Sequence, residues 1–348
     1  VAYAYVDFLS YAGPVQTGLR GLMGWKTPAD YWFPEIRSLG GAIFVLSMVL
    51  YPYVFLTARA SFIRQPATQL EVARALGRTP WGAFRAVALP LARPGIAVGV
   101  SLALMECLND IGAAGFFGVR TLTLGVYTTW LSQGNLGGAA QISAVMLLFI
   151  FVLLWIERQA RRRQSFVLPA QRPRQPDRIR LNGWQRALAV IVCGLPILIG
   201  FVLPALVLMS FAASRLEDAL SATYLKAVYH SLLLAVLAAA AAVLLGLVLG
   251  YANRAVQNGL TRRVIRLAAT GYAIPGTVLG IGVLIPLAAF DNALDSFLRE
   301  QVGVSSGLLL SGTITALVFA YVVRFLAVSF GAIETGLQKV TPNVAAAA

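Results

Sequence analysis

The side chains with most scope for recognition chemistry lie in one polar segment, residues 66–94, which reads PATQLEVARALGRTPWGAFRAVALPLARP. It stands between two stretches that are too apolar for water. Glu71, Arg74, Arg78 and Arg85 offer charges that can pair with a partner protein or with lipid headgroups. The segment is therefore interpreted as a docking site for a cytosolic protein. An ordinary cytoplasmic loop lying on the bilayer is the alternative.

A second chemical group lies inside an apolar stretch. Glu106 and Asp110 are spaced i and i+4, with Asn109 beside them. Carboxylates within a membrane are costly and are functional candidates by default. Two interpretations stay open: the three residues line a substrate path, or Asp110 caps a helix or pairs across helices.

No set of residues predicts an ATP-hydrolysing site or any other active site within the chain. A phosphate-binding Walker loop needs a Gly-Lys pair. The lysines follow other residues: Lys26 follows Trp25, Lys226 follows Leu225 and Lys339 follows Gln338. The single histidine, His230, has no catalytic constellation, and the two cysteines have no metal-binding spacing. We expect no catalytic residue, no metal site and no cofactor of its own.

Composition identifies the elements that must position these groups. The chain is 58% hydrophobic and only 12% charged, which excludes an ordinary soluble domain. Windows of roughly 18 apolar residues or more are long enough to cross a bilayer. They predict an all-α polytopic transmembrane helical bundle with spans at 38–58, 94–113, 139–156, 187–209, 229–252, 267–290 and 307–328.

The basic residues predict the orientation. Alternate connections carry 20 and 7 of the 28 lysines and arginines, and Arg324 lies within a span. Because cytoplasmic loops are enriched in these residues, the richer group, which includes 66–94, is placed inside. The net charge of +14 is thus a signal of topology in a multi-pass bacterial inner-membrane protein. No basic surface interleaved with aromatic residues suggests nucleic acid.

The chain divides into two halves of similar layout. Residues 1–156 form the first and 187–348 the second, joined by an Arg- and Pro-rich cytoplasmic linker at 157–186. In each half a span leads toward a cytosolic hairpin, and the chain stops where the second hairpin should begin. We expect spans to be missing from both ends. Such repeats form two bundles around a central pathway.

Local signals predict how the first hairpin folds. Thr68 to Glu71 fit a capping box at a helix start, and Gly77 can adopt the left-handed conformation that ends that helix. Thr79 and Pro80 predict the start of a second helix. Pro90 and Pro94 are expected to stop it.

The order of residues in the hairpin resembles a known motif. Glu71, Ala73, Gly77 and the pair Leu89-Pro90 are similar to the EAA motif of binding-protein-dependent ABC importer permeases, and Val72 departs from it. The segments WFPEIRSLGGAIFVLSMVLYPYVFLTARASF (32–62) and MECLNDIGAAGFFGVRTLTLGVYTTWL (105–131), with the fused two-half layout, resemble the ferric-iron permease family. That likeness covers essentially the whole chain.

The resemblance implies a function and partners. The hairpin would be the coupling helix that inserts into a groove on an ATPase subunit. Two such ATPase subunits, which hold ATP and Mg²⁺, are the implied cytoplasmic partners. The implied coupling residues are Glu71, Ala73, Arg74, Leu76, Gly77, Leu89 and Pro90. A periplasmic binding protein would deliver the substrate, which the resemblance implies is ferric iron, from the other side. Alanines at 345–348 stand where the second half would carry its motif.

The predicted function is therefore the permease of an ATP-driven importer that works by alternating access. Ferric iron rests on the resemblance alone, and thiamine, polyamine and phosphonate importers share the scaffold. The rival is a carrier driven by an ion gradient, in which Asp110 would be essential. A membrane scaffold without transport is the third possibility.

Overall fold

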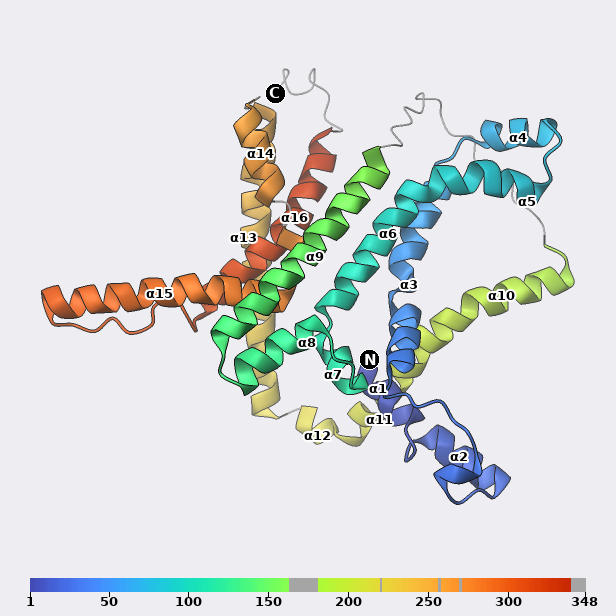
Figure 1. Ribbon diagram of the computed structural model, residues 1–348, viewed down its shortest axis with the longest axis horizontal. Helices are drawn as coiled ribbons and strands as arrows, with labels where there is room; N and C mark the ends of the chain where they lie inside the picture. The colour runs from blue at the N-terminus through green and yellow to red at the C-terminus, as the bar shows by residue number, and fades with distance from the viewer. Residues whose placement is uncertain (163–180, 220, 256–257, 269–270, 339–348) are drawn as a thin grey trace. The chain divides into compact units, whose positions relative to one another are not determined.

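The computed structural model describes residues 1–162, 181–219, 221–255, 258–268 and 271–338. These residues form helices joined by short connections, with no strand among them (Figure 1). The all-α prediction is confirmed. The central part of the predicted linker and the start of the expected second hairpin, residues 339–348, lie outside the described residues.

Long helices alternate with short ones along the chain. The helices are α1 (Ala2–Leu9), α2 (Pro14–Met23), η1 (Pro28–Asp30), α3 (Leu39–Ile63), α4 (Ala67–Ala75), α5 (Pro80–Ala83), η2 (Phe84–Ala88), α6 (Leu89–Asn109), α7 (Ile111–Phe117), α8 (Leu122–Tyr127), η3 (Thr128–Ser132), α9 (Leu136–Arg162), α10 (Gly183–Ile197), η4 (Leu198–Val202), α11 (Leu203–Ser214), α12 (Leu216–Ala219), α13 (Ala222–Ala255), α14 (Gly259–Ala268), η5 (Gly271–Ala273), α15 (Gly276–Val302) and α16 (Ile314–Gln338). The segments η2, η3 and η4 are π-helical, whereas η1 and η5 are short 3₁₀ turns.

Within the described residues, seven helices are long and apolar enough to cross a membrane, and each overlaps one predicted span. Together with the apolar composition, they make the chain a multi-pass membrane protein. Their bounds are Leu39–Ile63, Pro80–Asn109, Leu136–Ile156, Gly183–Ser214, Ala222–Ala255, Gly276–Val302 and Ile314–Glu334.

The sixth span is displaced from its predicted position. The sequence predicts 267–290, with Pro275 and Pro286 breaking it near the middle, but the helix runs over Gly276–Val302. Pro275 is its N-cap and therefore divides the predicted span, whereas the helix continues through Pro286. A proline at a helix start needs no N–H partner, which explains why Pro275 opens the helix.

The chain forms two compact units, which are described separately. One comprises Val1–Gly125 and Leu148–Ser214, and the other Val126–Leu147 and Arg215–Ala348. The two units are defined by which residues contact one another, whereas the two predicted halves are defined by a repeated layout along the sequence. The units therefore do not test the halves. The two-half organisation stays a prediction.

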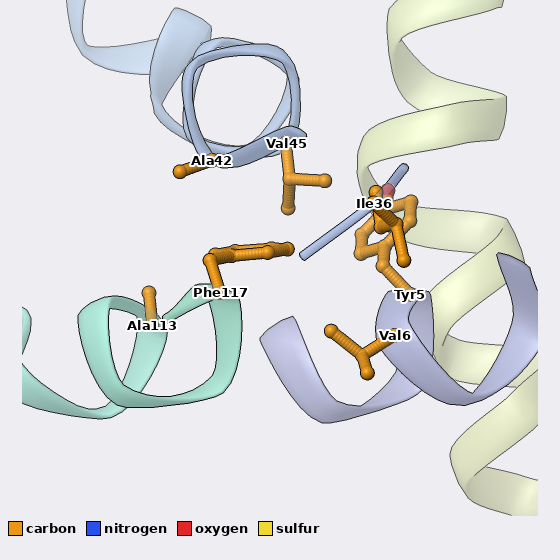
Figure 2. Packing of buried hydrophobic residues seen from close by; sticks show 7 residues of the cluster. All are labelled: Tyr5, Val6, Ile36, Ala42, Val45, Ala113 and Phe117. Carbon is orange, nitrogen blue, oxygen red and sulfur yellow. The ribbon is translucent and has the colours of Figure 1, made fainter. Parts of the chain in front are cut away.

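The first unit is centred on a small apolar core beside α3. Figure 2 shows residues from α1, α3 and α7 converging on one another, together with a residue of the segment before α3. The cluster consists of Tyr5, Val6, Ile36, Ala42, Val45, Ala113 and Phe117. The Tyr5 hydroxyl donates to the carbonyl of Ile199, so that η4 is held against α1. Burial of these side chains stabilises the packing of α1 and α7 against the start of α3.

Helices α3 and α6 approach each other backbone to backbone within this unit. A Cβ on Gly99 would lie 2.6 Å from Val54 Cα, and one on Gly95 would lie 2.9 Å from Ser61 Cβ. Neither position has room for a larger residue. Small residues at such crossings permit the close contact that stabilises helix pairs in lipid.

Helices α13 and α16 form the corresponding tight pair in the second unit. A Cβ on Gly246 would lie 2.9 Å from Ser329 Oγ, and one on Gly250 would lie 2.9 Å from Ile333 Cγ2. The Ser329 hydroxyl donates to the Ala242 carbonyl at 2.8 Å. The four-residue spacing of Gly246 and Gly250, and of Gly276 and Gly280, predicts close helix packing. The first pair lies at this contact as predicted, but nothing among the described residues lies within 4 Å of a Cβ added to Gly280.

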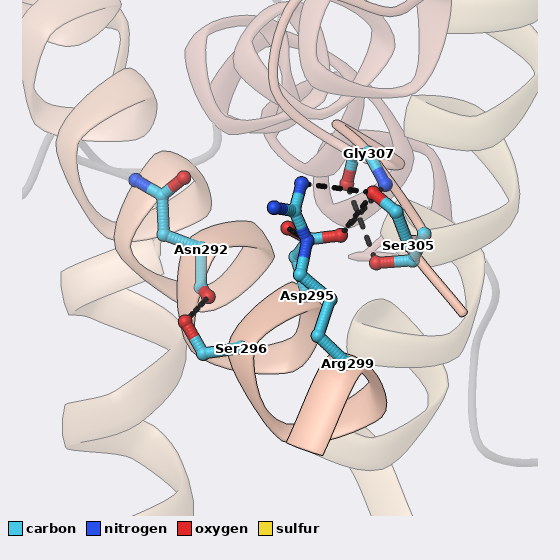
Figure 3. A network of polar contacts seen from close by, with 7 residues as sticks. Asn292, Asp295, Ser296, Arg299, Ser305 and Gly307 are labelled. Atoms are coloured by element: carbon cyan, nitrogen blue, oxygen red, sulfur yellow. Dashed lines mark hydrogen bonds and ion pairs between the residues drawn. The ribbon is translucent and has the colours of Figure 1, made fainter. Parts of the chain in front are cut away.

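The connection between α15 and α16 folds back along α15. Asp291 is fully buried and accepts from the Ser311 hydroxyl at 2.6 Å and from the Ser311 amide at 2.7 Å. One turn later, Asp295 pairs with Arg299 at 2.7 Å and accepts from the Ser305 hydroxyl at 2.7 Å (Figure 3). These carboxylates hold residues 303–313 against the helix.

Candidate functional site

The first arm of the predicted docking hairpin is α4, and it begins earlier than the sequence predicts. Its N-cap is Pro66, with no side-chain capping bond. Thr68 is already the second helical residue, so the predicted capping box from Thr68 to Glu71 is wrong. Pro66 has an extended conformation, with ψ at 127°, and the helix begins two residues early directly after it.

Gly77 ends this arm as predicted. Its φ is +85°, in the left-handed region that glycine adopts without a steric penalty. The Gly77 amide donates to the Arg74 carbonyl at 3.0 Å, and the Arg78 amide donates to the Ala73 carbonyl at 3.1 Å. This pair of bonds is a Schellman motif, which satisfies carbonyls left free at the helix end.

The second arm begins at Thr79 and Pro80, also as predicted. The Gly82 amide donates to Thr79 Oγ1 at 3.1 Å, and Pro80 occupies the first turn. The expectation that Pro90 and Pro94 stop this helix is wrong. The helix continues through both, and Pro80–Asn109 forms one 30-residue span. The π-helical turn η2 precedes Pro90 and adjusts the backbone where the missing N–H would break regular bonding.

The base of the hairpin is held by residues outside the predicted motif. Gln65 is buried, and its Nε2 donates to the Ala88 carbonyl at 2.8 Å. The ring of Phe62, at the end of α3, stacks on Phe84 at a centroid distance of 5.9 Å. The polar Gln65 just before Pro66 is the signal in the sequence that could have indicated this clamp.

Small residues line the inner face of the hairpin. Four alanines are buried there, two from α4 and two from the second arm: Ala67, Ala73, Ala83 and Ala88. Ala73, one of the predicted coupling residues, thus serves the packing of the two arms. Short side chains at this face allow α4 to lie close to the second arm.

The outer face of the hairpin is apolar and charged at once. Leu76 is 79% exposed and Trp81 is 59% exposed, while Val72 is also exposed. The Arg85 guanidinium lies 4.7 Å from the centre of the Trp81 ring, and Trp81 stacks on Phe84 at 5.2 Å. We call this set of exposed residues, with Glu71 and Arg74, the hairpin face. An apolar centre rimmed by charges is typical of a protein-binding surface.

The predicted coupling residues therefore fall into two groups. Glu71, Arg74 and Leu76 are exposed on the hairpin face. Ala73, Gly77, Leu89 and Pro90 shape the hairpin and its junction with α6, where Leu89 and Pro90 are half-buried. The structure brings all seven into one local element.

The predicted intramembrane group is divided by a helix end. Glu106 and Asn109 lie in α6, which ends at Asn109, and Asp110 has ψ of 91°. Asp110 Oδ1 accepts from the Ala113 amide at 2.8 Å and thereby caps α7. Glu106 and Asp110 are consequently not successive turns of one helix. Of the two interpretations left open, the capping role of Asp110 is the one that the geometry supports.

No group of three or more His, Cys, Asp or Glu residues within the described part of the chain could hold a metal ion. The geometry of the hairpin is that of a recognition element, since its exposed groups are suited to packing and ion pairing.

Comparisons with known proteins match the part of the sequence that contains the hairpin. The family described as "Binding-protein-dependent transport system inner membrane component" matches residues 23–165, which include the whole hairpin. No solved structure matches the chain.

Three curated relatives come from different transport systems. The chain is 27% identical over 159 residues to the molybdenum transport system permease protein ModB of Escherichia coli (strain K12), covering 43% of this chain and 69% of ModB. It is 21% identical over 270 residues to the Fe(3+)-transport system permease protein FbpB 2 of Haemophilus influenzae, covering 75% of this chain and 52% of that protein. It is 26% identical over 164 residues to the putative 2-aminoethylphosphonate transport system permease protein PhnU of Salmonella paratyphi A, covering 46% of this chain and 55% of PhnU.

The matched region contains the hairpin and three of the seven candidate spans. The three relatives are all permease proteins of transport systems, but their names give different substrates. Over residues 23–165 the chain is thus similar to the inner-membrane components of binding-protein-dependent transport systems.

Proposed function

We propose that this chain is the permease subunit of an ATP-driven importer, and that an ATPase binds its hairpin on the cytosolic side. The permease moves substrate by alternating access and makes or breaks no covalent bond. The observation that carries this proposal is the hairpin face, an exposed recognition surface built directly onto a membrane-spanning helix.

The continuity of the second arm gives the mechanism its physical basis. Because Pro80–Asn109 is one helix, a displacement of Trp81 at the hairpin reaches α6 without crossing a loop. The bond from Gln65 to Ala88 ties the same helix to the end of α3. Force on the hairpin therefore acts on two packed spans together, which is how ATP binding in a partner would rock the permease.

The hairpin face also defines the chemistry of its partner. Leu76 and Trp81 require an apolar groove, because their exposed surface would otherwise face water. Glu71 requires a basic or hydrogen-bond-donating group at the rim, and Arg74 an acidic one. We propose two ATPase subunits as these partners, with a periplasmic binding protein on the opposite side.

The match to FbpB 2 extends over 75% of the chain and supports ferric iron as the substrate. Molybdenum and phosphonate relatives match shorter stretches and make an oxyanion the second candidate.

The test is uptake into proteoliposomes that contain the intact permease, its ATPase and its binding protein. ATP should drive uptake of the substrate that the binding protein carries, with ferric iron and molybdate compared directly. Glu71→Arg and Gly77→Pro should abolish both ATPase association and uptake, whereas Asp110→Asn should leave the energy source unchanged. Uptake driven by a proton or sodium gradient without ATPase, and lost in Asp110→Asn, would establish a secondary carrier. A complex that assembles but transports nothing would establish a scaffold.

A further inference from the structure

Helix α14 is a short helix between two candidate spans of the second unit. The span in α13 ends at Ala255 and the span in α15 begins at Gly276, while α14 covers Gly259–Ala268. Ten helical residues rise about 15 Å, which is roughly half of the hydrocarbon thickness of a bilayer. Because α14 is too short to cross the membrane, it lies on the side where α13 ends and α15 begins.

The arginines of this connection indicate that its side is cytosolic. The sequence of α14, GLTRRVIRLA, has arginine at positions 262, 263 and 266 and no acidic residue. Arg254, at the end of α13, adds a further arginine. Connections rich in arginine stay in the cytoplasm, where the adjacent leaflet carries anionic lipids. The charge of α14 is therefore opposite to that of the nearest membrane surface.

One face of α14 packs on the protein and another is exposed. Ile265 is only 4% exposed, and α14 contacts α13 and α16 of the same unit (Figure 1). Val264 is 56% exposed and Leu267 is 74% exposed. Residues three apart share a face of a helix, so these two form an apolar surface that points away from Ile265.

An exposed arginine borders this apolar surface. Arg263 precedes Leu267 by four residues, so the two are neighbours on the surface of the helix. A helix with apolar side chains on one face and arginines beside them is typical of a segment that lies in the plane of a membrane surface. In that arrangement the apolar side chains enter the boundary of the acyl chains, and the arginines reach the lipid phosphates.

The exposed surface of α13 gives the level at which α14 begins. Leu244, Val248 and Tyr251 are 64%, 63% and 73% exposed, and their spacing of four and three residues places them on one face of α13. Tyrosines are enriched where a membrane protein meets the lipid headgroups. Tyr251 thus marks the headgroup level one turn before α13 ends, and α14 follows directly after that end.

We propose that α14 lies in the cytoplasmic membrane surface and that Arg263, Val264 and Leu267 bind anionic lipid there. Lipid is favoured over an acidic protein because α14 connects two membrane-spanning helices, one of which exposes an apolar face up to the headgroup level. The arginines supply the complement to the phosphate charge. This lipid site goes beyond the proposed function and does not depend on the hairpin.

The first experiment measures where Val264 lies relative to the bilayer. The intact chain with Cys107→Ser, Cys193→Ser and Val264→Cys carries one thiol, which is labelled with an environment-sensitive fluorophore. The labelled chain is reconstituted in nanodiscs of phosphatidylcholine and phosphatidylglycerol. Lipids that carry a spin label near the headgroup should quench this probe strongly, whereas iodide in the water should quench it weakly.

Val72→Cys in the same background is the matched control. Val72 is 58% exposed on the hairpin, close to the value for Val264, and the proposed function places it in water. Its probe should be quenched by iodide and not by lipid. Each result is read at its own position, so a failure at Val264 leaves the hairpin proposal standing. Should Val264→Cys fail to fold, Leu267→Cys provides the second position on the same face.

A second arm tests the preference for anionic lipid. Phosphatidylglycerol should quench the Val264 probe more strongly than phosphatidylcholine that carries the same label at the same mole fraction. Arg263→Gln should lower this preference by up to about fivefold, the factor that one arginine contributes near an anionic surface. Arg263→Lys, which keeps the charge, should restore the preference, and salt at about 1 M should reduce it by screening.

The proposal requires both results. It is overturned if iodide rather than lipid quenches the Val264 probe, which would place the apolar face of α14 in water. It is also overturned if phosphatidylglycerol and phosphatidylcholine quench equally in the unmodified and Arg263→Gln chains. A photoreactive residue at position 267 that captures a protein instead of lipid in intact membranes would likewise overturn it and identify a protein contact.

Discussion

The Arg78 amide donates to the Ala73 carbonyl at 3.1 Å, and this bond closes the first arm of the hairpin around Gly77. The geometry requires the φ of +85° at Gly77. Gly77→Ala should therefore destabilise the hairpin by about 1–2 kcal/mol, the cost of a left-handed alanine. Faster hydrogen exchange over residues 67–78 would record this change, together with weaker ATPase association.

Gly18→Ala is the control for this substitution. Gly18 lies in α2, where an added Cβ meets nothing within 4 Å and the backbone is right-handed. It should leave exchange in the hairpin unchanged. Equal exchange in Gly77→Ala and the unmodified chain would contradict the role of the left-handed turn.

The contact between α13 and α16 predicts a packing defect. Gly246→Leu would drive a side chain toward the backbone of Phe330 and the hydroxyl of Ser329. Overpacking of this kind should destabilise the pair by about 1–3 kcal/mol. Thermal unfolding in detergent should show a lower midpoint. Gly280→Leu, where the space is open, should show a much smaller change, and equal shifts would refute the packing role.

We expect the buried carboxylate of Asp291 to hold the connection from α15 to α16 in place. Asp291→Ala removes the acceptor of the Leu310 and Ser311 amides and of the Ser311 hydroxyl. Residues 303–313 should then exchange faster and become sensitive to protease. Asn292→Ala, at an exposed neighbouring position, should have neither effect. An unchanged connection in Asp291→Ala would show that other contacts hold it.

Asp30 predicts a defined dependence on pH in the segment before α3. Hydrogen bonds from the Thr27 amide, the Lys26 amide and the Thr27 hydroxyl lower the pKa of the Asp30 carboxyl. Since the folded pKa lies below the unfolded one, the stabilisation is complete above about pH 4 and is lost as pH falls through the folded pKa. Exchange protection of the Lys26 and Thr27 amides should thus be constant from neutral pH to about pH 5 and fall in stronger acid.

Asp30→Asn should weaken this protection at neutral pH, and Glu35→Gln, at an exposed position in the same segment, should not. Protection that declines between pH 7 and pH 5 would contradict the assignment to a carboxyl with a lowered pKa.

Much of the fold follows from local patterns in the sequence. Apolar length locates all seven candidate spans, and Gly77, Thr79 and Pro80 mark the turn of the hairpin. These features depend on backbone conformation and burial over a few neighbouring residues. The types of those residues are therefore enough to predict them.

Features that depend on distant packing were not predictable in the same way. Pro90 and Pro94 indicate a helix end, but α6 continues through them because η2 precedes Pro90 and Gly99 packs on α3. No local pattern in the sequence indicates that Asp291 is buried, because the connection that covers it follows about twenty residues later and returns along α15. The clamp from Gln65 to Ala88 joins residues whose proximity only the folded hairpin reveals. The coupling roles of the hairpin residues stay a prediction.

The most direct test of the proposed function is a crosslink from Leu76, the most exposed apolar residue of the hairpin face. A photoreactive residue at this position should capture an ATPase subunit in intact membranes, and nucleotide should change the yield. The same residue at Leu244, on the exposed apolar surface of α13, should capture no ATPase. If Leu76 captures only lipid, or no ATPase in membranes that contain one, the hairpin is not the coupling element.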